Sequence, residues 1–133
     1  MQKSKETIVE IIKQELRKHK EISFAYLHGS FAEKDTFHDI DIAVFLNELP
    51  ESKLDYELKL ETKLIQVISG IVDVRILNNA PLSFRYHVIK QGVPLLIRDD
   101  NERVEFQEFT LSRYFDFAFF RAMYLKETLG LGV

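Results

Sequence analysis

The segment DIDIAVFL, residues 39–46, constrains the fold more than any other part of this chain. Its side chains alternate between charged and apolar at the start, and a period of two is typical of a β-strand whose faces meet different surroundings. Ile40 and Ile42 mark the face that joins a hydrophobic core, whereas Asp39 and Asp41 lie on the other face. The chain must therefore build a sheet that presents two carboxylates, roughly 6 to 7 Å apart at their Cα atoms, on one face.

The rest of the sequence predicts an alternation of helices and strands. Strands are predicted over residues 22–28, 39–46, 71–77 and 93–97. Four helices are predicted: over residues 4–19, from Pro50 to just before Gly70, from Pro81 to about Lys90, and from about Asn101 to Leu129. Pro50 is expected in the first turn of the second helix, a position that suits proline. Pro94 cannot donate to a sheet ladder, so the last strand is expected at an edge. This order predicts an α/β (α+β) fold, a small mixed sheet flanked by helices with a long C-terminal helix.

Composition limits the class of protein. A chain of 133 residues with 46% hydrophobic content and no linker or repeat predicts a single domain over residues 1–133. The net charge of -3 argues against direct binding of nucleic acid. The absence of cysteine excludes disulfides and cysteine-ligated zinc. The polar amino terminus and the lack of a membrane-length apolar window predict a cytoplasmic protein with no membrane contact.

The paired aspartates indicate a metal site. Two carboxylates this close repel each other, and a divalent cation between Asp39 and Asp41 removes that repulsion. Oxygen-only ligands favour Mg²⁺ or Mn²⁺. Asp73 lies in the strand predicted over residues 71–77 and completes a three-carboxylate cluster if the two strands are neighbours. Such a cluster can hold two ions for in-line displacement at phosphorus.

Gly29 and Ser30 follow the strand predicted over residues 22–28. A glycine lets the backbone approach a ligand closely, and a serine hydroxyl can donate to a phosphate oxygen. Free N–H groups of a short helix beginning near Ser30 would add to that attraction. Phosphate donors beside metal ligands indicate a nucleoside triphosphate.

Each of these features has a simpler interpretation. Gly29 and Ser30 alone are typical of a turn, and the two aspartates alone are compatible with a solvated strand face. Asp73 can pair with Arg75, its neighbour on the same face. Histidines at 28 and 38 are each expected in a solvated loop more readily than as ligand or base. The function is therefore indicated by the ordered combination.

Three segments together resemble the minimal nucleotidyltransferase (MNT) family of the DNA polymerase β-like superfamily. They are HGSF (28–31), DIDIAV (39–44) and VDVRILNNAP (72–81), followed by GVPLL (92–96). The resemblance implies the nucleotidyltransferase fold, with Gly29 and Ser30 holding the triphosphate of ATP. It also implies two Mg²⁺ ions bound by Asp39, Asp41 and Asp73, with Asp73 helping to activate the acceptor hydroxyl.

The resemblance further implies a protein partner. Stand-alone members resemble the MntA-type antitoxin of HEPN/MNT toxin–antitoxin modules, an adenylyltransferase that moves AMP from ATP to a tyrosine of a helical HEPN toxin. Independently, the segment YFDFAFFRAMYL (114–125) is apolar nearly all round. One side of such a helix is expected on its own chain and the other on a partner, either the toxin or a second copy in a homo-oligomer. The alternative is a core helix buried entirely within the chain.

Two other functions remain open. A non-catalytic antitoxin that only occludes its partner is favoured by FAEKDTFH (31–38), which is shorter and more acidic than its counterpart in most of the family. Lys34 is the candidate for a compensating positive charge there. Nucleotidyl transfer to a small molecule is the other, although enzymes of that kind usually carry an additional helical domain that 133 residues hardly allow.

Overall fold

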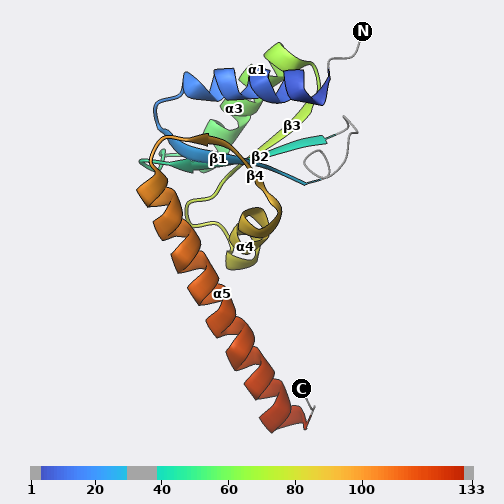
Figure 1. Cartoon of the computed structure of the whole chain (residues 1–133), viewed down its shortest axis with the longest axis vertical. Helices are drawn as coiled ribbons and strands as arrows, with labels where there is room; N and C mark the ends of the chain where they lie inside the picture. Colours follow the sequence, from blue (N-terminus) through green and yellow to red (C-terminus); the bar gives the residue numbers. More distant parts are fainter. Residues whose placement is uncertain (1–3, 30–38, 131–133) are drawn as a thin grey trace.

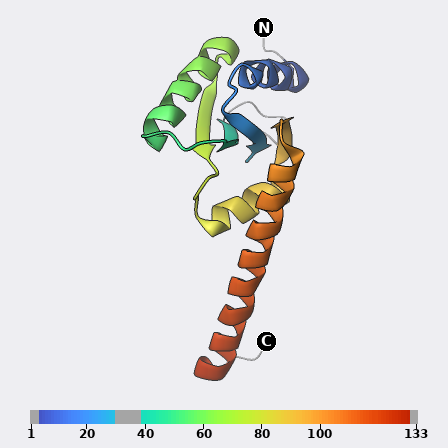
Figure 2. The same cartoon turned by 90° about the vertical axis from the view of Figure 1, so that its left-hand side faces the viewer.

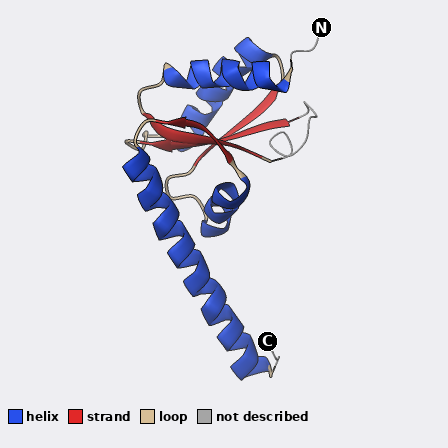
Figure 3. Ribbon diagram, in the orientation of Figure 1, coloured by secondary structure: helices blue, strands red, loops and turns tan. Residues whose placement is uncertain are grey.

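The computed structural model describes residues 4–29 and 39–130, and in them four strands form one mixed sheet (Figures 1 and 3). The strands are β1 (Ile22–His28), β2 (Asp39–Leu46), β3 (Ile71–Ile76) and β4 (Val93–Ile97). Their spatial order is β3-β2-β1-β4, with β2 and β3 parallel and β1 antiparallel to both of its neighbours. The mixed sheet and the edge position of β4 are confirmed.

Helices cover both faces of the sheet. They are α1 (Lys5–Arg17), α3 (Lys53–Ile68), α4 (Leu82–Gln91) and α5 (Asp100–Leu129). In Figure 1, α1 and α3 lie on one side of the sheet, and α4 and the start of α5 lie on the other. The predicted fold class, with its long C-terminal helix, is therefore confirmed.

Each face of the sheet has its own hydrophobic core. The larger core joins the apolar face of β2, including Ile40 and Ile42, to α1 and α3. The smaller core lies under α4 and α5 and is mainly aromatic, with the rings of Phe24 and Phe45 stacked at 4.8 Å. Burial of each large apolar side chain contributes roughly 1.5 to 3 kcal/mol. The alternation in DIDIAVFL thus separates a core face from a face that is only partly covered.

Helix α3 begins later than the sequence predicts. The Ser52 hydroxyl accepts a hydrogen bond of 3.1 Å from the backbone N–H of Asp55, so Ser52 is the N-cap. Pro50 lies before the cap, and its prediction as a first-turn residue was wrong. A serine satisfies a free N–H group at a helix start, which a proline cannot do.

Two glutamates of α3 bind the edge of the sheet. Glu61 accepts a hydrogen bond of 2.9 Å from the backbone N–H of Val74, and Glu57 accepts one of 2.9 Å from that of Ile76. Their spacing of four residues places both carboxylates on one face of α3. They satisfy N–H groups on the outer side of β3 and fix the strand that carries Asp73.

Helix α5 leaves the body of the protein (Figure 2). Phe106 and Thr110 are buried near its start, but its later aromatic residues are exposed. The exposed large side chains beyond residue 114 are Phe115, Phe117, Phe119, Phe120, Met123 and Tyr124, at 41% to 66%. The expectation that one side of this segment packs on its own chain holds only at its start, where the rings of Tyr114 and Phe115 contact Tyr86 of α4. The alternative of a core helix was wrong. No helix in the described ranges has the length and apolarity of a membrane span.

Candidate active site

The sheet brings the three predicted aspartates onto one face. Asp41 and Asp73 are register partners in the parallel β2–β3 pair, and Asp39 is paired with Ile71. Neighbouring strands lie about 4.8 Å apart, and residues two apart on a strand share a face. Asp39, Asp41 and Asp73 therefore form a triangle of side chains at the amino-terminal ends of β2 and β3.

Gly29 brings the end of β1 against the same triangle. Its backbone has φ of +76°, a left-handed conformation that residues with a side chain rarely adopt. A Cβ atom at this position would collide with Oδ2 of Asp41 and lie 3.1 Å from its Cγ. The glycine therefore allows the chain to pass directly beside the carboxylate. Ser30, Lys34, His38 and the rest of residues 30–38 lie outside the described residues.

The carboxylates influence one another electrostatically. Burial raises the pKa of Asp41, and the negative charges of Asp73 and Asp39 raise it further. Arg75 opposes this shift, and its Nε lies 3.2 Å from Oδ2 of Asp73. The alternative pairing of Asp73 with Arg75 is thus observed, with both side chains substantially exposed. An exposed ion pair of this kind is worth only about 0.2 to 1 kcal/mol, so it yields readily to a stronger partner.

The donor set fits a divalent cation, although the side chains do not already enclose one. Three carboxylates with oxygen-only ligands, mutual repulsion and one raised pKa match the chemistry of Mg²⁺ or Mn²⁺. Across residues 4–29 and 39–130, no three acidic or histidine side chains gather closely enough to form a ready-made metal site. The backbone therefore supplies the placement, and the carboxylates would have to turn inward to bind.

His28 belongs to this site, contrary to the expectation of a solvated loop histidine. It is a buried residue of β1, paired in register with Asp41, and its ring meets the edge of Phe84 at 5.5 Å. Burial, followed by the nearby His87, lowers the pKa of His28 to about 4. Its Nε2 has no hydrogen-bond partner among the described residues. The alternation of Phe24, Tyr26 and His28 in one strand was the signal for its inward direction.

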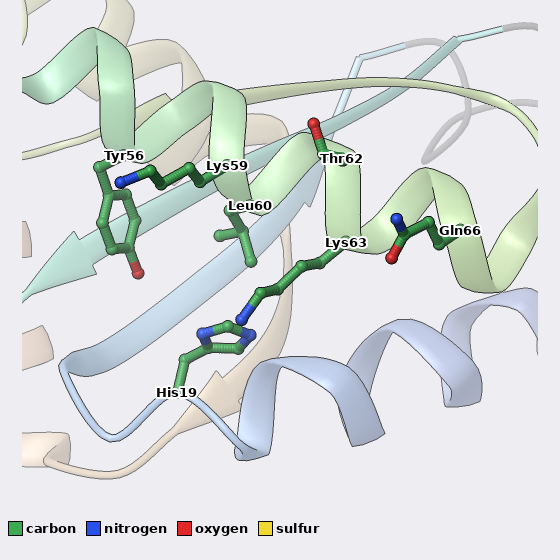
Figure 4. A pocket seen from close by; sticks show the side chains of 7 residues that line it. All are labelled: His19, Tyr56, Lys59, Leu60, Thr62, Lys63 and Gln66. Atoms are coloured by element: carbon green, nitrogen blue, oxygen red, sulfur yellow. The ribbon is translucent and has the colours of Figure 1, made fainter.

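A cavity of about 460 Å³ lies away from the carboxylates, between α3 and the end of α1 (Figure 4). His19 and Lys63 point toward each other there, and Tyr56 and Lys59 lie further along α3. Several of its polar groups already have partners within the chain. His19 Nε2 lies 2.9 Å from Glu15, the Tyr56 hydroxyl donates to Glu21 at 2.5 Å, and Lys59 pairs with Asp55 at 3.0 Å. These contacts indicate a structural role for this side of the molecule.

Comparisons with known proteins identify a family and a shared fold. The model of the family described as polymerase beta, nucleotidyltransferase, matches residues 10–101. A chain from the complex of a tri-AMPylated Shewanella oneidensis HEPN toxin with MNT antitoxin is 23% identical, with a TM-score of 0.73 over 94% of this chain and 98% of that chain. The MntA–HepT toxin–antitoxin gives 22% identity and a TM-score of 0.72 over 93% and 98%.

A toxin–antitoxin structure with AMP-PNP gives 23% identity and a TM-score of 0.73, over 91% of this chain and 98% of that chain. At such identities these three structures show a shared fold. No curated protein sequence matches the chain significantly.

Proposed function

Because the chain belongs to the polymerase beta nucleotidyltransferase family, we propose that it transfers AMP from ATP to a hydroxyl group of a partner protein. The acceptor is a tyrosine of a HEPN-family toxin, and the transfer silences the toxin, so the chain acts as an antitoxin. The observation that carries this proposal is the register of Asp41 with Asp73, with Asp39 on the same face and Gly29 against Asp41.

The carboxylates have distinct tasks in this reaction. Asp39, Asp41 and Asp73 would hold divalent cations, either two Mg²⁺ ions or Mn²⁺ in their place. When bound there, such cations would neutralise charge on the phosphate oxygens and make the acceptor hydroxyl more acidic. Gly29 leaves room for the triphosphate beside Asp41, and Ser30 donates to a phosphate oxygen. In these roles the protein chiefly positions the triphosphate and the acceptor hydroxyl, as is usual in phosphoryl and nucleotidyl transfer.

The transfer exchanges one bond to phosphorus for another. The acceptor oxygen forms a bond to the α-phosphorus of ATP while the bond to the oxygen bridging the α- and β-phosphorus breaks. Pyrophosphate leaves with that bridging oxygen, and Asp73 accepts the proton of the acceptor hydroxyl. The AMP group is thereby linked to the partner through a phosphodiester bond.

The choice of nucleotide and partner is supported by the structural relatives and by α5. One relative was solved with AMP-PNP, and another contains a tri-AMPylated HEPN toxin. The exposed aromatic part of α5, residues 115–124, offers the apolar area that a protein partner would cover. A second copy of this chain would cover it in a homo-oligomer.

Labelled ATP tests the proposal directly. The protein, Mg²⁺, α-labelled ATP and the HEPN-family product of the neighbouring gene should give a labelled partner, with AMP on a tyrosine by mass spectrometry. Asp41→Asn should abolish the label. Asp55→Asn is the matched control, because Asp55 is an exposed carboxylate of α3, on the opposite side of the sheet, and its ion-pair partner among the described residues is Lys59. Absence of transfer by the wild type, or equal transfer by Asp41→Asn, would refute catalysis.

Two observations favour a second candidate, a non-catalytic antitoxin. Asp73 is paired with Arg75, and the described carboxylates do not already enclose a metal site. This candidate predicts a tight complex that forms without ATP. It also predicts that the complex protects cells equally well when Asp39, Asp41 and Asp73 are all replaced by asparagine.

A further inference from the structure

Two arginines flank one exposed phenylalanine where α4 meets α5. The guanidinium carbon of Arg113 lies 4.9 Å from the ring centroid of Phe109, and that of Arg85 lies 5.9 Å from it. The side chain of Phe109 is 51% exposed. Cation–π contacts with the same ring therefore bring the two positively charged guanidinium groups near each other at the surface.

Neither arginine has an anionic partner in the part of the chain that the structure describes. No carboxylate there forms an ion pair with either guanidinium. The Nε of Arg85 is buried and lacks an acceptor among the described residues. Burial, followed by the charge of Arg113, lowers the pKa of Arg85. A buried donor without an acceptor is destabilising, so an oxygen ligand that reaches Arg85 would be favoured.

Arg85 and Phe109 line a cavity. It has a volume of about 460 Å³, and Arg85, Phe106, Phe109, Glu102 and Glu105 are among its lining residues. The apolar rings suit an apolar neighbour of the anion. The two glutamates repel negative charge, and they repel an extended polyanion more strongly than a single carboxylate. With a net charge of -3 on the chain, a single carboxylate fits this surface better than nucleic acid does.

We propose that Arg85, Phe109 and Arg113 form a clamp for one carboxylate of the protein partner that lies along α5. The two guanidinium groups donate to the carboxylate oxygens, and the ring of Phe109 contacts the adjoining apolar surface of the partner. Phe109 is continuous along the helix with the exposed aromatic part of α5. The clamp rests on the proposed function, since it names a contact with the same partner.

Binding of the HEPN-family product of the neighbouring gene tests the clamp. Affinity is measured by calorimetry for wild type, for the double variant Arg85→Gln/Arg113→Gln and for the corresponding double lysine variant. The double glutamine variant should bind the partner about 10- to 100-fold more weakly. The partner's carboxylate would then be buried in the interface without the two positive charges that balance it. The double lysine variant keeps the charge without the planar donor fork and should recover part of the loss.

Three controls separate a binding role from a structural one. Arg17→Gln removes an exposed arginine of α1, on the opposite side of the sheet, and should leave affinity unchanged. The thermal unfolding midpoint of the double glutamine variant should stay close to that of wild type, because removal of the repulsion between the two arginines offsets the loss of their contacts with the ring of Phe109. AMP-PNP binding should also be retained.

The outcomes separate the two proposals. Equal partner affinity of wild type and double variant overturns the clamp while leaving the proposed function intact. A double variant that binds the partner normally but loses affinity for RNA overturns the clamp in favour of nucleic acid. If the wild-type protein binds no HEPN-family product at all, the proposed function falls, and the clamp falls with it.

Discussion

Replacing Gly29 with alanine should weaken both the fold and the candidate active site. An alanine at φ of +76° costs about 1 to 2 kcal/mol in backbone strain. Its Cβ would also collide with Oδ2 of Asp41 and lie 3.1 Å from Cγ and 3.4 Å from Cβ of that residue. Relief requires the carboxylate to move, and overpacking of this kind typically costs about 1 to 3 kcal/mol. The expected loss of unfolding free energy is therefore about 2 to 5 kcal/mol.

Urea unfolding in a double-mutant cycle separates the two causes. In Gly29→Ala/Asp41→Ala the collision with the carboxylate is gone and only the backbone strain remains. The two substitutions should therefore be coupled by about 1 to 3 kcal/mol, with the double variant more stable than the sum of the singles predicts. Gly70→Ala is the matched control, because a Cβ there meets nothing within 4 Å and φ is not positive. It should change stability by less than about 1 kcal/mol.

Additivity would refute this reasoning. If the effects of Gly29→Ala and Asp41→Ala sum within about 0.5 kcal/mol, the glycine is not required by the carboxylate. Nucleotide binding provides the functional measurement. Gly29→Ala should weaken AMP-PNP binding, since the displaced carboxylate and the added methyl group occupy the proposed triphosphate position. Unchanged AMP-PNP affinity would contradict that position for the triphosphate.

Three further predictions concern the same region. Asp41→Asn should stabilise the protein near neutral pH, because the raised pKa of Asp41 means that its ionised form opposes folding. The gain should vanish as pH falls below the ordinary aspartate pKa of about 3.9, and thermal melts that show a less stable variant at neutral pH would contradict it. Glu61→Ala should cost about 1 to 3 kcal/mol by leaving the N–H of Val74 unpaired, whereas Glu61→Gln should cost less in urea unfolding. Equal losses in the two variants would count against this role. His28 should stay neutral on acidification until about pH 4 in an NMR titration, and a midpoint near its ordinary value would refute its burial beside α4. Because the folded pKa of His28 is lowered, its contribution to stability should decline as pH falls from about 6.5 toward that midpoint.

The sequence predicted the elements better than their contacts. The alternation in DIDIAVFL predicted which side chains of β2 face the core, because that pattern is local. Asp41 and Asp73 are register partners although they lie far apart in the chain. The sequence alone could predict that the two residues meet only if their strands are neighbours, which it could not establish. The family resemblance supplied the reason to expect that condition.

Two predictions failed because the deciding contacts are tertiary. The aromatic residues at 115–124 showed how much apolar surface the helix carries but not that α5 would point away from the sheet. His28 was expected in a solvated loop, yet it is the buried last residue of β1, and Phe84 of α4 lies against its ring. In both cases exposure depends on whether another element packs against the side chain, and the local sequence pattern does not show this.

The glutamates of α3 also have a consequence for solubility. An unpaired sheet edge can recruit a strand from another molecule and begin aggregation. Glu57 and Glu61 occupy backbone N–H groups on the outer side of β3, and at the opposite edge Pro94 removes a donor from β4. The sheet is thus discouraged from growing at either end. Contacts with other molecules are directed to the helical surface, where recognition depends on side chains and can be selective.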